Sequence, residues 1–397
     1  MQITYTAPNR SHHYPYAEAM LEQGVLRCFV SGFPRLSPRA SSPALFGRMK
    51  RVDTFQTLYL LSLRLRAPSS LVAALNRFAN TEMDQASYAF ARDSDVFIYY
   101  RTTGMRTARR LKRERRNTLC VMEEVNSHVE VCHGLMKEEY ERLSRGPYKD
   151  TFSDERLRLQ AYEEADCILC PSGFVQASFL EKGFALRRLL LVPYGCMIGT
   201  ETKAFAAKRR TAFRILFVGQ LHFRKGLRYL IEAFERLDHP RKELVLVGPP
   251  TGVTGLEDVR LPKNVFLTGA LKGPELADQY MNADVFVLPS IEEGLALVQG
   301  EALSYGLPLV ITTNTGGSEL IRDGIEGLIV RPGDAGVIKD ALQRLVSEES
   351  LLPQMQAAAL LRSKELGGWS KTVCLLREKL QSLIPSGAAM QRHGVYL

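Results

Sequence analysis

The stretch ADVFVLPSIEEGLALVQGEALSYGLPLVI, residues 283–311, decides the fold of this chain. Asp284 opens an apolar run, Val285 to Pro289, whose length and β-branched content predict a buried parallel strand. Ala296 to Tyr305 predicts a helix, and Pro308 to Ile311 predicts a second strand. The order is therefore strand, loop, helix, strand, which is typical of a parallel sheet covered by helices.

This unit carries two acidic residues near the place where ligands bind. Glu293 and Gly294 follow the strand, and Glu301 comes eight residues after Glu293, near the helix start. Free amides at a helix N-terminus bind anions, and open parallel sheets bind ligands at the carboxyl ends of their strands. In a simpler interpretation both glutamates are solvated loop and cap charges, because acids are common at helix starts.

The frame around the two glutamates resembles that of a known family. Pro289-Ser290, Glu293-Gly294, Glu301-Ala302 and Gly306-Leu307-Pro308 are similar to the E-x7-E signature of retaining glycosyltransferases of family four. The similarity extends over residues 160 to 375. It implies an α/β architecture of the GT-B type, in which two Rossmann-like domains with parallel sheets face a central cleft.

A glycine turn that follows the apolar strand Phe213 to Val218 has the properties of a phosphate site. Gly219 is followed by Arg224 and Lys225, and then by the helix Leu227 to Leu237. Amides and the helix dipole attract an anion at such a place, and the two side chains add full positive charges. Cations at a helix start without an anion would oppose the dipole, so a phosphate ligand is the favoured interpretation.

The resemblance assigns roles to these residues. It implies that Arg224 and Lys225 stabilise the departing diphosphate, that Glu293 orients the sugar hydroxyls and that Glu301 binds the ribose. We therefore expect the catalytic residues His128, Arg224, Lys225 and Glu293, and the donor-binding residues Gly219, Arg224, Lys225, Glu293, Gly294, Leu295, Ala296, Leu297 and Glu301.

Three positions depart from the family pattern. Gln220 stands where arginine is frequent, so the diphosphate has one cation fewer unless Arg224 substitutes. Leu295 and Ala296 replace the more usual Phe and Gly, which leaves the donor open between UDP- and GDP-sugars. We expect no cofactor and no metal. The D-x-D pattern at Asp93 to Asp95 precedes its strand, at the wrong end of the sheet for a ligand, and predicts a cap or turn.

Histidines in the first half are the candidates for a group that contacts the transferring sugar. His128 follows a strand predicted to end at Met122, and the resemblance calls for a histidine at such a strand end, facing the cleft. His133, five residues on, is the alternative. His12 and His13 lie in the first predicted loop, where adjacent histidines are more often solvated than catalytic.

Composition indicates a soluble protein of two domains. Hydrophobic residues make up 45% and charged residues 24% of 397, and no apolar run reaches the roughly 18 residues of a spanning helix. The start lacks the pattern of a signal peptide, and the seven scattered cysteines favour a reducing compartment. We therefore expect a cytoplasmic protein. Cys167 and Cys170 have the spacing of a zinc knuckle, but in a strand they point to opposite faces.

The alternation of strands and helices, read with the resemblance, predicts four parts. Residues 1–195 form an N-terminal acceptor-side domain, 196–211 a linker and 212–375 the nucleotide-sugar domain. Residues 376–397 are a helix and tail that return to the N-terminal domain. Residues 44–80 mix Leu, Phe and Arg at helical spacing and predict helices.

Positive charge gathers in the first half of the chain. Residues 1–200 hold 28 Lys and Arg against 21 Asp and Glu, whereas the remainder holds 24 against 22. In Arg106 to Arg116 seven of eleven residues are basic. This segment is either a solvated helix face or a contact with an anionic membrane surface or a lipid-phosphate acceptor. Nucleic acid is disfavoured, because no aromatics alternate with the arginines.

These patterns together predict a retaining glycosyltransferase that uses a nucleotide-diphosphate sugar, with a role in glycan, glycolipid or surface-polysaccharide synthesis, possible attachment at the inner membrane face and a lipid-linked acceptor. One alternative is another enzyme on the same fold, an epimerase or a phosphorylase. Another is a catalytically degenerate protein that acts as a binding or scaffold subunit.

Overall fold

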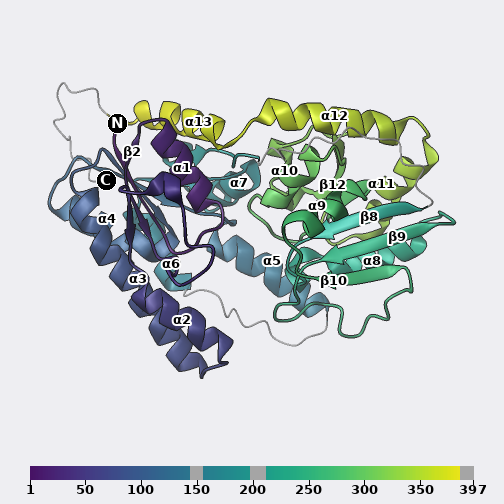
Figure 1. Ribbon diagram of the computed structural model, residues 1–397, viewed down its shortest axis with the longest axis horizontal. Coiled ribbons are helices and arrows are strands. Elements are labelled where there is room, and N and C mark those ends of the chain that lie inside the picture. The colour runs from purple at the N-terminus through teal and green to yellow at the C-terminus, as the bar shows by residue number, and fades with distance from the viewer. Residues whose placement is uncertain (144–154, 197–211, 385–397) are drawn as a thin grey trace.

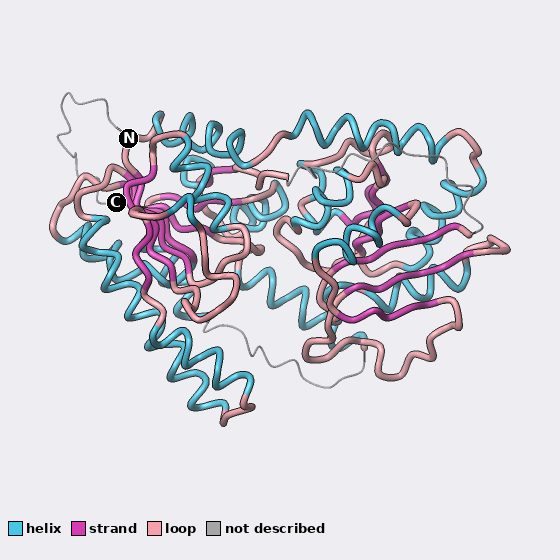
Figure 2. The backbone as a smooth tube through the Cα atoms, viewed as in Figure 1, coloured by secondary structure: helices cyan, strands magenta, loops and turns pink. Residues whose placement is uncertain are grey.

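Two parallel sheets, one in each half of the chain, form the frame of the protein. The computed structural model describes residues 1–143, 155–196 and 212–384. Figure 2 shows the strands in two separate groups, each surrounded by helices. Every strand pairing in both sheets is parallel, as the alternating pattern predicted.

The N-terminal sheet has seven strands in the order β3-β2-β1-β4-β5-β6-β7. Its strands are β1 Ile3–Ala7, β2 Leu26–Ser31, β3 Met49–Arg51, β4 Val96–Tyr100, β5 Leu119–Glu123, β6 Cys167–Cys170 and β7 Leu189–Leu191. Its helices are α1 His13–Glu22, α2 Thr54–Arg64, α3 Ser69–Ala91, α4 Met105–Arg113, α5 Val129–Arg142, α6 Glu155–Glu164 and α7 Gly173–Glu181, with the short 3-10 turns η1 Pro43–Leu45, η2 Arg101–Gly104 and η3 Leu186–Arg188.

The C-terminal sheet has six strands in the order β10-β9-β8-β11-β12-β13. Its strands are β8 Phe213–Val218, β9 Lys242–Val247, β10 Val265–Gly269, β11 Val285–Leu288, β12 Leu309–Thr312 and β13 Gly327–Val330. Its helices are α8 Leu227–Arg236, α9 Gly273–Met281, α10 Leu297–Ser304, α11 Ala335–Ser347 and α12 Leu351–Leu366, with the 3-10 turns η4 Phe223–Lys225, η5 Thr313–Thr315 and η6 Gly317–Glu319. The strand, loop, helix and strand predicted over residues 283–311 are thus confirmed as β11, α10 and β12.

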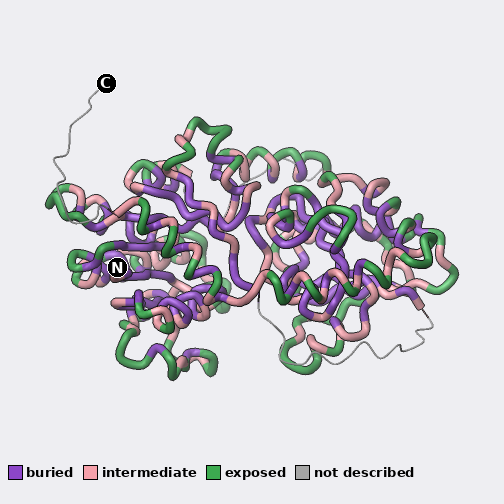
Figure 3. Tube along the Cα trace, turned by 90° about the horizontal axis from the view of Figure 1, so that it is seen from above, coloured by how far each residue is buried: buried purple, intermediate pink, exposed green. Residues whose placement is uncertain are grey.

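The strands are buried on both faces because helices cover both sides of each sheet. All four residues of β11 and all four of β12 are buried, which explains their uninterrupted apolar sequence. In Figure 3 the buried residues run through the middle of both domains and the exposed residues lie at the periphery.

The last helix, α13 Trp369–Gln381, leaves the C-terminal domain and packs on α1 (Figure 1). Ser370 Oγ donates to Glu22 at 3.0 Å and Thr372 Oγ1 donates to the carbonyl of Pro193 at 3.1 Å. The return to the N-terminal domain therefore begins at Trp369, and the boundary placed at residue 375 falls inside this helix. Residues 197–211 of the expected linker and the end of the tail lie outside the described residues.

In both sheets the strand order reverses beside the first strand of the domain, between β1 and β4 and between β8 and β11. Ligands of open parallel sheets bind outside the carboxyl ends of the strands at such a reversal. No helix in the described residues is both long enough and apolar enough to cross a membrane.

Candidate active site between the two sheets

The loops that follow β8 and β11 meet at the reversal of the C-terminal sheet. Gly226 links η4 to α8 with a φ of 66°, in the left-handed region, and an added Cβ would lie 2.1 Å from the carbonyl oxygen of Pro289. Only glycine fits there. The amide of Ile291 donates to the carbonyl of Arg224 at 2.8 Å. This close approach brings the two predicted motifs of the donor site together.

Lys225, Arg224 and Glu293 form one ionic cluster where these loops meet. The ammonium group of Lys225 pairs with the Glu293 carboxylate, and Arg224 Nη1 lies 3.2 Å from Glu293 Oε2. Lys225 is 7% exposed. The two predicted phosphate-binding cations are thus held by a carboxylate of the protein itself.

The cluster alters the proton affinities of its members. Burial by itself raises the pKa of Glu293, but Arg224 and Lys225 hold that pKa below its ordinary value. Burial lowers the pKa of Lys225, and Glu293 offsets part of this shift. An anionic ligand that replaced Glu293 beside the two cations would meet the same favourable field.

Glu292, which precedes the predicted catalytic glutamate, links the two domains. It is fully buried and accepts hydrogen bonds from Ser127 N at 3.0 Å, Ser127 Oγ at 2.9 Å and Asn126 Nδ2 at 3.0 Å. Arg224 Nη1 donates to its backbone carbonyl at 2.7 Å. The carboxyl ends of β5 and β11 therefore meet through this side chain. The sequence interpretation did not include Glu292.

The remaining donor-site residues surround the cluster. Glu301, on α10, accepts a hydrogen bond from the Tyr280 hydroxyl at 2.9 Å, and burial raises its pKa. Gly294 lies so close to the N-terminal domain that an added Cβ would be 1.6 Å from the carbonyl oxygen of Val125. The other predicted positions lie in the loops at β8 and α10: Gly219 follows β8, Leu295 is buried, Ala296 precedes α10 and Leu297 begins it. Gln220, the departure from the family pattern, is exposed.

On the N-terminal side a second carboxylate is held between two cations. Glu124 follows β5 directly, is fully buried, and accepts hydrogen bonds from Arg101 Nε at 3.0 Å and Arg158 Nη2 at 2.8 Å. Arg101 Nη2 also donates to Asn126 Oδ1 at 2.6 Å. Its φ of 49° is unusual for a residue other than glycine, and such strain is frequent at functional sites.

These contacts form one continuous polar network across the interface. It runs from Glu124 through Arg101 and Asn126 to Glu292, and from there to Arg224. The N-terminal members were missed because they come from three separate segments of sequence, after β4, after β5 and on α6. The one available signal was the adjacent pair of glutamates at positions 123 and 124, directly after a predicted strand.

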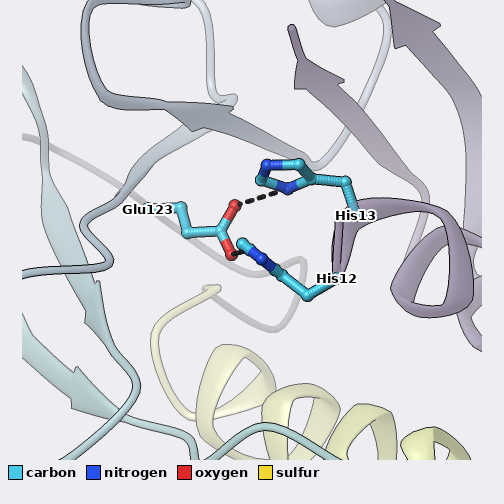
Figure 4. A group of neighbouring side chains, drawn as sticks. All are labelled: His12, His13 and Glu123. Carbon is cyan, nitrogen blue, oxygen red and sulfur yellow. Dashed lines mark hydrogen bonds and ion pairs between the residues drawn. The ribbon is translucent and has the colours of Figure 1, made fainter. Parts of the chain in front are cut away.

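A third group lies beside this network (Figure 4). His12 Nε2 donates to Glu123 Oε1 at 2.8 Å, and His13 Nδ1 lies 3.4 Å from Glu123 Oε2. The Tyr5 hydroxyl donates to Glu123 Oε2 at 2.7 Å. The expectation that both histidines are solvated is therefore wrong: His12 is 7% exposed and His13 is fully buried, because α1 begins here and packs under α13. His12 stacks on Tyr194, with ring centroids 4.4 Å apart.

The donor atoms of His12, His13 and Glu123 lie within 4.8 Å of one another, and imidazole with carboxylate is a ligand set that zinc accepts. In the structure these atoms bond to each other and to Tyr5, which closes the group as a hydrogen-bond network. Burial lowers the pKa of His13 to about 4, so its ring is neutral at physiological pH. The prediction that no metal is needed stays a prediction.

The structure corrects the placement of His128. Its ring is 1% exposed and packs against Tyr162, Phe179 and Phe184, with centroids 5.0 to 5.8 Å away. Its Nδ1 accepts the amide of Glu130 and so caps α5. The ring turns into the domain core because it is surrounded by aromatic side chains, and it is the preceding Asn126 and Ser127 that contact the opposite domain. The alternative, His133, pairs with Glu155.

Comparison with known proteins relates the C-terminal domain to one family and the chain to one fold. Residues 212–348 match the family described as glycosyl transferases group 1. These residues are a glycosyl transferases group 1 domain, and the chain has the GT-B fold. The sucrose-phosphate synthase of Thermosynechococcus elongatus aligns with a TM-score of 0.68 and 17% identity, over 96% of this chain and 99% of that one. Anabaena HepE in complex with UDP aligns with a TM-score of 0.66 and 14% identity, over 96% and 100%.

A sequence relative supports the same family. The D-inositol 3-phosphate glycosyltransferase of Pseudarthrobacter chlorophenolicus is 30% identical over 223 residues, which cover 52% of this chain and 51% of that protein. The chain thus spans about half the length of the curated relatives it matches. The comparisons confirm the resemblance to family-four glycosyltransferases that was inferred from the E-x7-E signature. They also confirm the predicted fold.

Proposed function

We propose that the protein is a retaining glycosyltransferase that transfers a sugar from a UDP- or GDP-sugar to an acceptor held by the N-terminal domain. The observation that carries the proposal is the cluster of Arg224, Lys225 and Glu293 at the reversal of the C-terminal sheet. Breaking the bond between sugar and diphosphate leaves an anion, and two fixed cations beside a helix N-terminus stabilise that anion.

The ion pair in the structure indicates how the donor enters. The diphosphate takes the place of the Glu293 carboxylate beside Arg224 and Lys225, and Glu293 is then released to accept hydrogen bonds from the sugar hydroxyls. Glu301 keeps one oxygen on Tyr280, so its other oxygen is the one that binds the ribose. In this proposal Glu292 keeps Arg224 in position while Glu293 moves.

The N-terminal domain supplies the acceptor side. Arg101, which follows β4, and Asn126, which follows β5, are linked to the donor loop through Glu292, and in this proposal they contact the acceptor. The acceptor belongs to glycan, glycolipid or surface-polysaccharide synthesis, and we place it on a lipid at the inner face of a membrane. His128 acts through its position at the start of α5 and not through its ring.

A screen of donors tests the proposal. Thermal shift with UDP- and GDP-sugars, followed by chromatography of released nucleotide, should reveal one donor that stabilises the protein and is slowly hydrolysed. UDP-sugars come first, because UDP is bound in Anabaena HepE. Activity should persist in excess EDTA, since Arg224 and Lys225 supply the positive charge that a metal ion would otherwise provide beside the diphosphate. Loss of activity in EDTA, with recovery in Mg²⁺ or Mn²⁺, would contradict that expectation.

Each alternative function has its own outcome in this screen. Donor binding without hydrolysis or transfer would favour a scaffold subunit. Conversion of the donor to a different sugar nucleotide would favour an epimerase, and phosphate-dependent cleavage of a glycan would favour a phosphorylase. Absence of any nucleotide-sugar effect would overturn the proposal.

A further inference from the structure

A hairpin of two helices in the N-terminal domain exposes apolar side chains in a way unlike the rest of the protein. The hairpin, residues 54–81, comprises α2 and the first half of α3 and extends beyond the sheet in Figure 1. Its exposed large side chains are Leu58 at 44%, Leu61 at 47%, Leu63 at 47%, Leu65 at 70%, Leu71 at 49% and Phe78 at 56%. These are six of the fourteen exposed large hydrophobic side chains in the described residues.

Two polar residues of α2 lie on the inner side of the hairpin. Gln56 and Ser62 of α2 are 7% and 6% exposed, whereas Leu58, Leu61 and Leu65 face outward at the helical spacing i, i+3 and i+7. A helix in contact only with water has the opposite arrangement. An apolar stripe of this size marks a surface that contacts another apolar phase.

The charge of the hairpin identifies that phase. Residues 54–81 contain no Asp or Glu, and they contain three arginines, Arg64, Arg66 and Arg77, all of which are exposed. None of the three has an ion-pair partner among the described residues. Leucines interspersed with arginines suit the boundary between lipid headgroups and acyl chains of an anionic bilayer, where the cations meet phosphates and the leucines are buried.

The basic segment Arg106 to Arg116 lacks these properties. On α4, Arg109 pairs with Glu164 at 2.7 Å, Arg110 with Glu114 at 2.8 Å and Lys112 with Asp166 at 3.4 Å. No large hydrophobic side chain of this segment is exposed. Much of its positive charge is therefore already matched within the protein.

The hairpin tip lies on the side of the N-terminal sheet that carries the candidate site. The chain enters α2 from the carboxyl end of β3, and α3 returns it to the amino end of β4. With 23 residues α3 is about 35 Å long, roughly twice the length of a five-residue strand, so its first half projects past the carboxyl edge. Glu124 and Asn126 lie at that same edge.

We propose that the α2–α3 hairpin inserts its leucine tip into the surface of an anionic membrane and so brings a lipid-borne acceptor to the cleft. This inference rests on the proposed function only for the acceptor. The docking itself concerns a surface separate from the donor cluster, so the two can fail independently.

Arg66 provides an unusually clean variant. It follows α2 with a φ of 51°, a conformation that glycine adopts without strain. Arg66→Gly therefore removes a cation from the tip without adding backbone strain. Together with Arg64→Gln it should lower partition onto anionic vesicles by about 25-fold, at roughly fivefold per cation. Leu61→Gln with Leu65→Gln should lower it about tenfold or more.

The test is flotation of the full-length protein with vesicles of phosphatidylcholine alone or with 40% phosphatidylglycerol, at low and high salt. The matched control changes Arg109, Arg110, Lys112 and Arg113 of α4 to Gln and should alter partition less than threefold. A second control, Leu361→Gln on α12, removes an equally exposed leucine far from the hairpin. Donor-induced thermal shift should be the same in all these variants, which separates failure of docking from failure of the donor site.

Insertion has its own readout. The native tryptophan, Trp369, is buried, so Leu65→Trp adds one exposed indole whose emission should shift to the blue and be quenched by brominated anionic lipid. Wild-type binding by the hairpin variants, loss of binding only in the α4 variant, or absence of binding to either vesicle would overturn the proposal. Lipid-free dimerisation that the leucine variants abolish would also overturn it, because the hairpin would then be a protein interface.

Discussion

Each domain carries two adjacent glutamates after a central strand, and the two pairs are held differently. Glu123 ends β5 and Glu124 follows it; both are fully buried and bond to tyrosine, histidine and arginine side chains of their own domain. Glu292 and Glu293 follow β11. Of these, Glu292 bonds across the interface, whereas the side chain of Glu293 pairs with Arg224 and Lys225 of its own domain.

This difference separates a fixed framework from an exchangeable site. A carboxylate with several short bonds to groups that are themselves buried cannot leave without exposing unpaired charges. A carboxylate that pairs with cations at a loop end can be replaced there by another anion. In our proposal the N-terminal pair therefore maintains the shape of the interface, and Glu293 is the carboxylate that a diphosphate replaces.

Glu124→Gln should have the largest effect of these changes, and the quantity affected should be the stability of the protein. The change keeps the shape of the side chain but leaves Arg101 and Arg158 without their shared carboxylate. Breaking a buried ion pair costs about 3 to 5 kcal/mol of the free energy of unfolding. Urea denaturation at pH 7 measures it. The control is Glu164→Gln, which breaks the partly exposed pair with Arg109 and should cost under about 1 kcal/mol. Equal costs would remove the distinction between framework and surface pairs.

Lys225→Ala should act mainly on the reaction. Loss of a charge-assisted contact of about 1.5 to 3 kcal/mol lowers kcat/KM roughly tenfold to 150-fold. Steady-state kinetics with the donor found in the screen measures this loss. Arg228→Ala, one turn along α8, breaks an exposed pair with Asp258 and serves as the control. If both variants keep wild-type kinetics, the cluster does not bind the diphosphate.

The same contrast explains what could be predicted from sequence. The donor side lies in two short segments, each a strand, a loop and a helix, so local order together with the family resemblance was enough to single out Arg224, Lys225 and Glu293, which the structure brings together. The N-terminal network joins the ends of β4 and β5 with α6, and no local pattern shows that Arg101 and Arg158 meet at Glu124. His128 was misplaced for the same reason: its position after a strand was correct, but the aromatic rings that enclose it come from α6, α7 and the residues that follow.

Acid should weaken the N-terminal framework through its histidines. Burial lowers the pKa of His128 to about 4, so the folded state keeps the ring neutral while the unfolded chain takes up a proton below about pH 6.5. Stability is therefore lost as the pH falls from 6.5 towards 4. From these values His128 alone accounts for about 2 kcal/mol between pH 7 and pH 5.

His128→Asn tests this contribution, because asparagine keeps a cap on α5 and does not titrate. The difference in unfolding free energy between pH 7 and pH 5 should shrink by about 2 kcal/mol in the variant. Each protein is compared with itself at the two pH values, so packing lost at both cancels. An unchanged difference would mean that the ring is protonated in the folded protein.

Ser127→Ala should have the smallest effect of these changes, and it tests the contact between the N-terminal domain and Glu292. The change removes the hydroxyl bond to Glu292 and keeps the backbone bond, at a cost of about 1 kcal/mol. Because this contact joins the domains in front of the donor site, the cost should appear as a donor KM about fivefold higher, with kcat nearly unchanged. Ser178→Ala is matched to it, since the Ser178 hydroxyl accepts the amide of His128 wholly within the N-terminal domain. That control should lower stability by a similar amount and leave KM alone. If the two variants raise KM equally, Glu292 does not position the donor loop, and the link between framework and exchangeable site is only a packing contact.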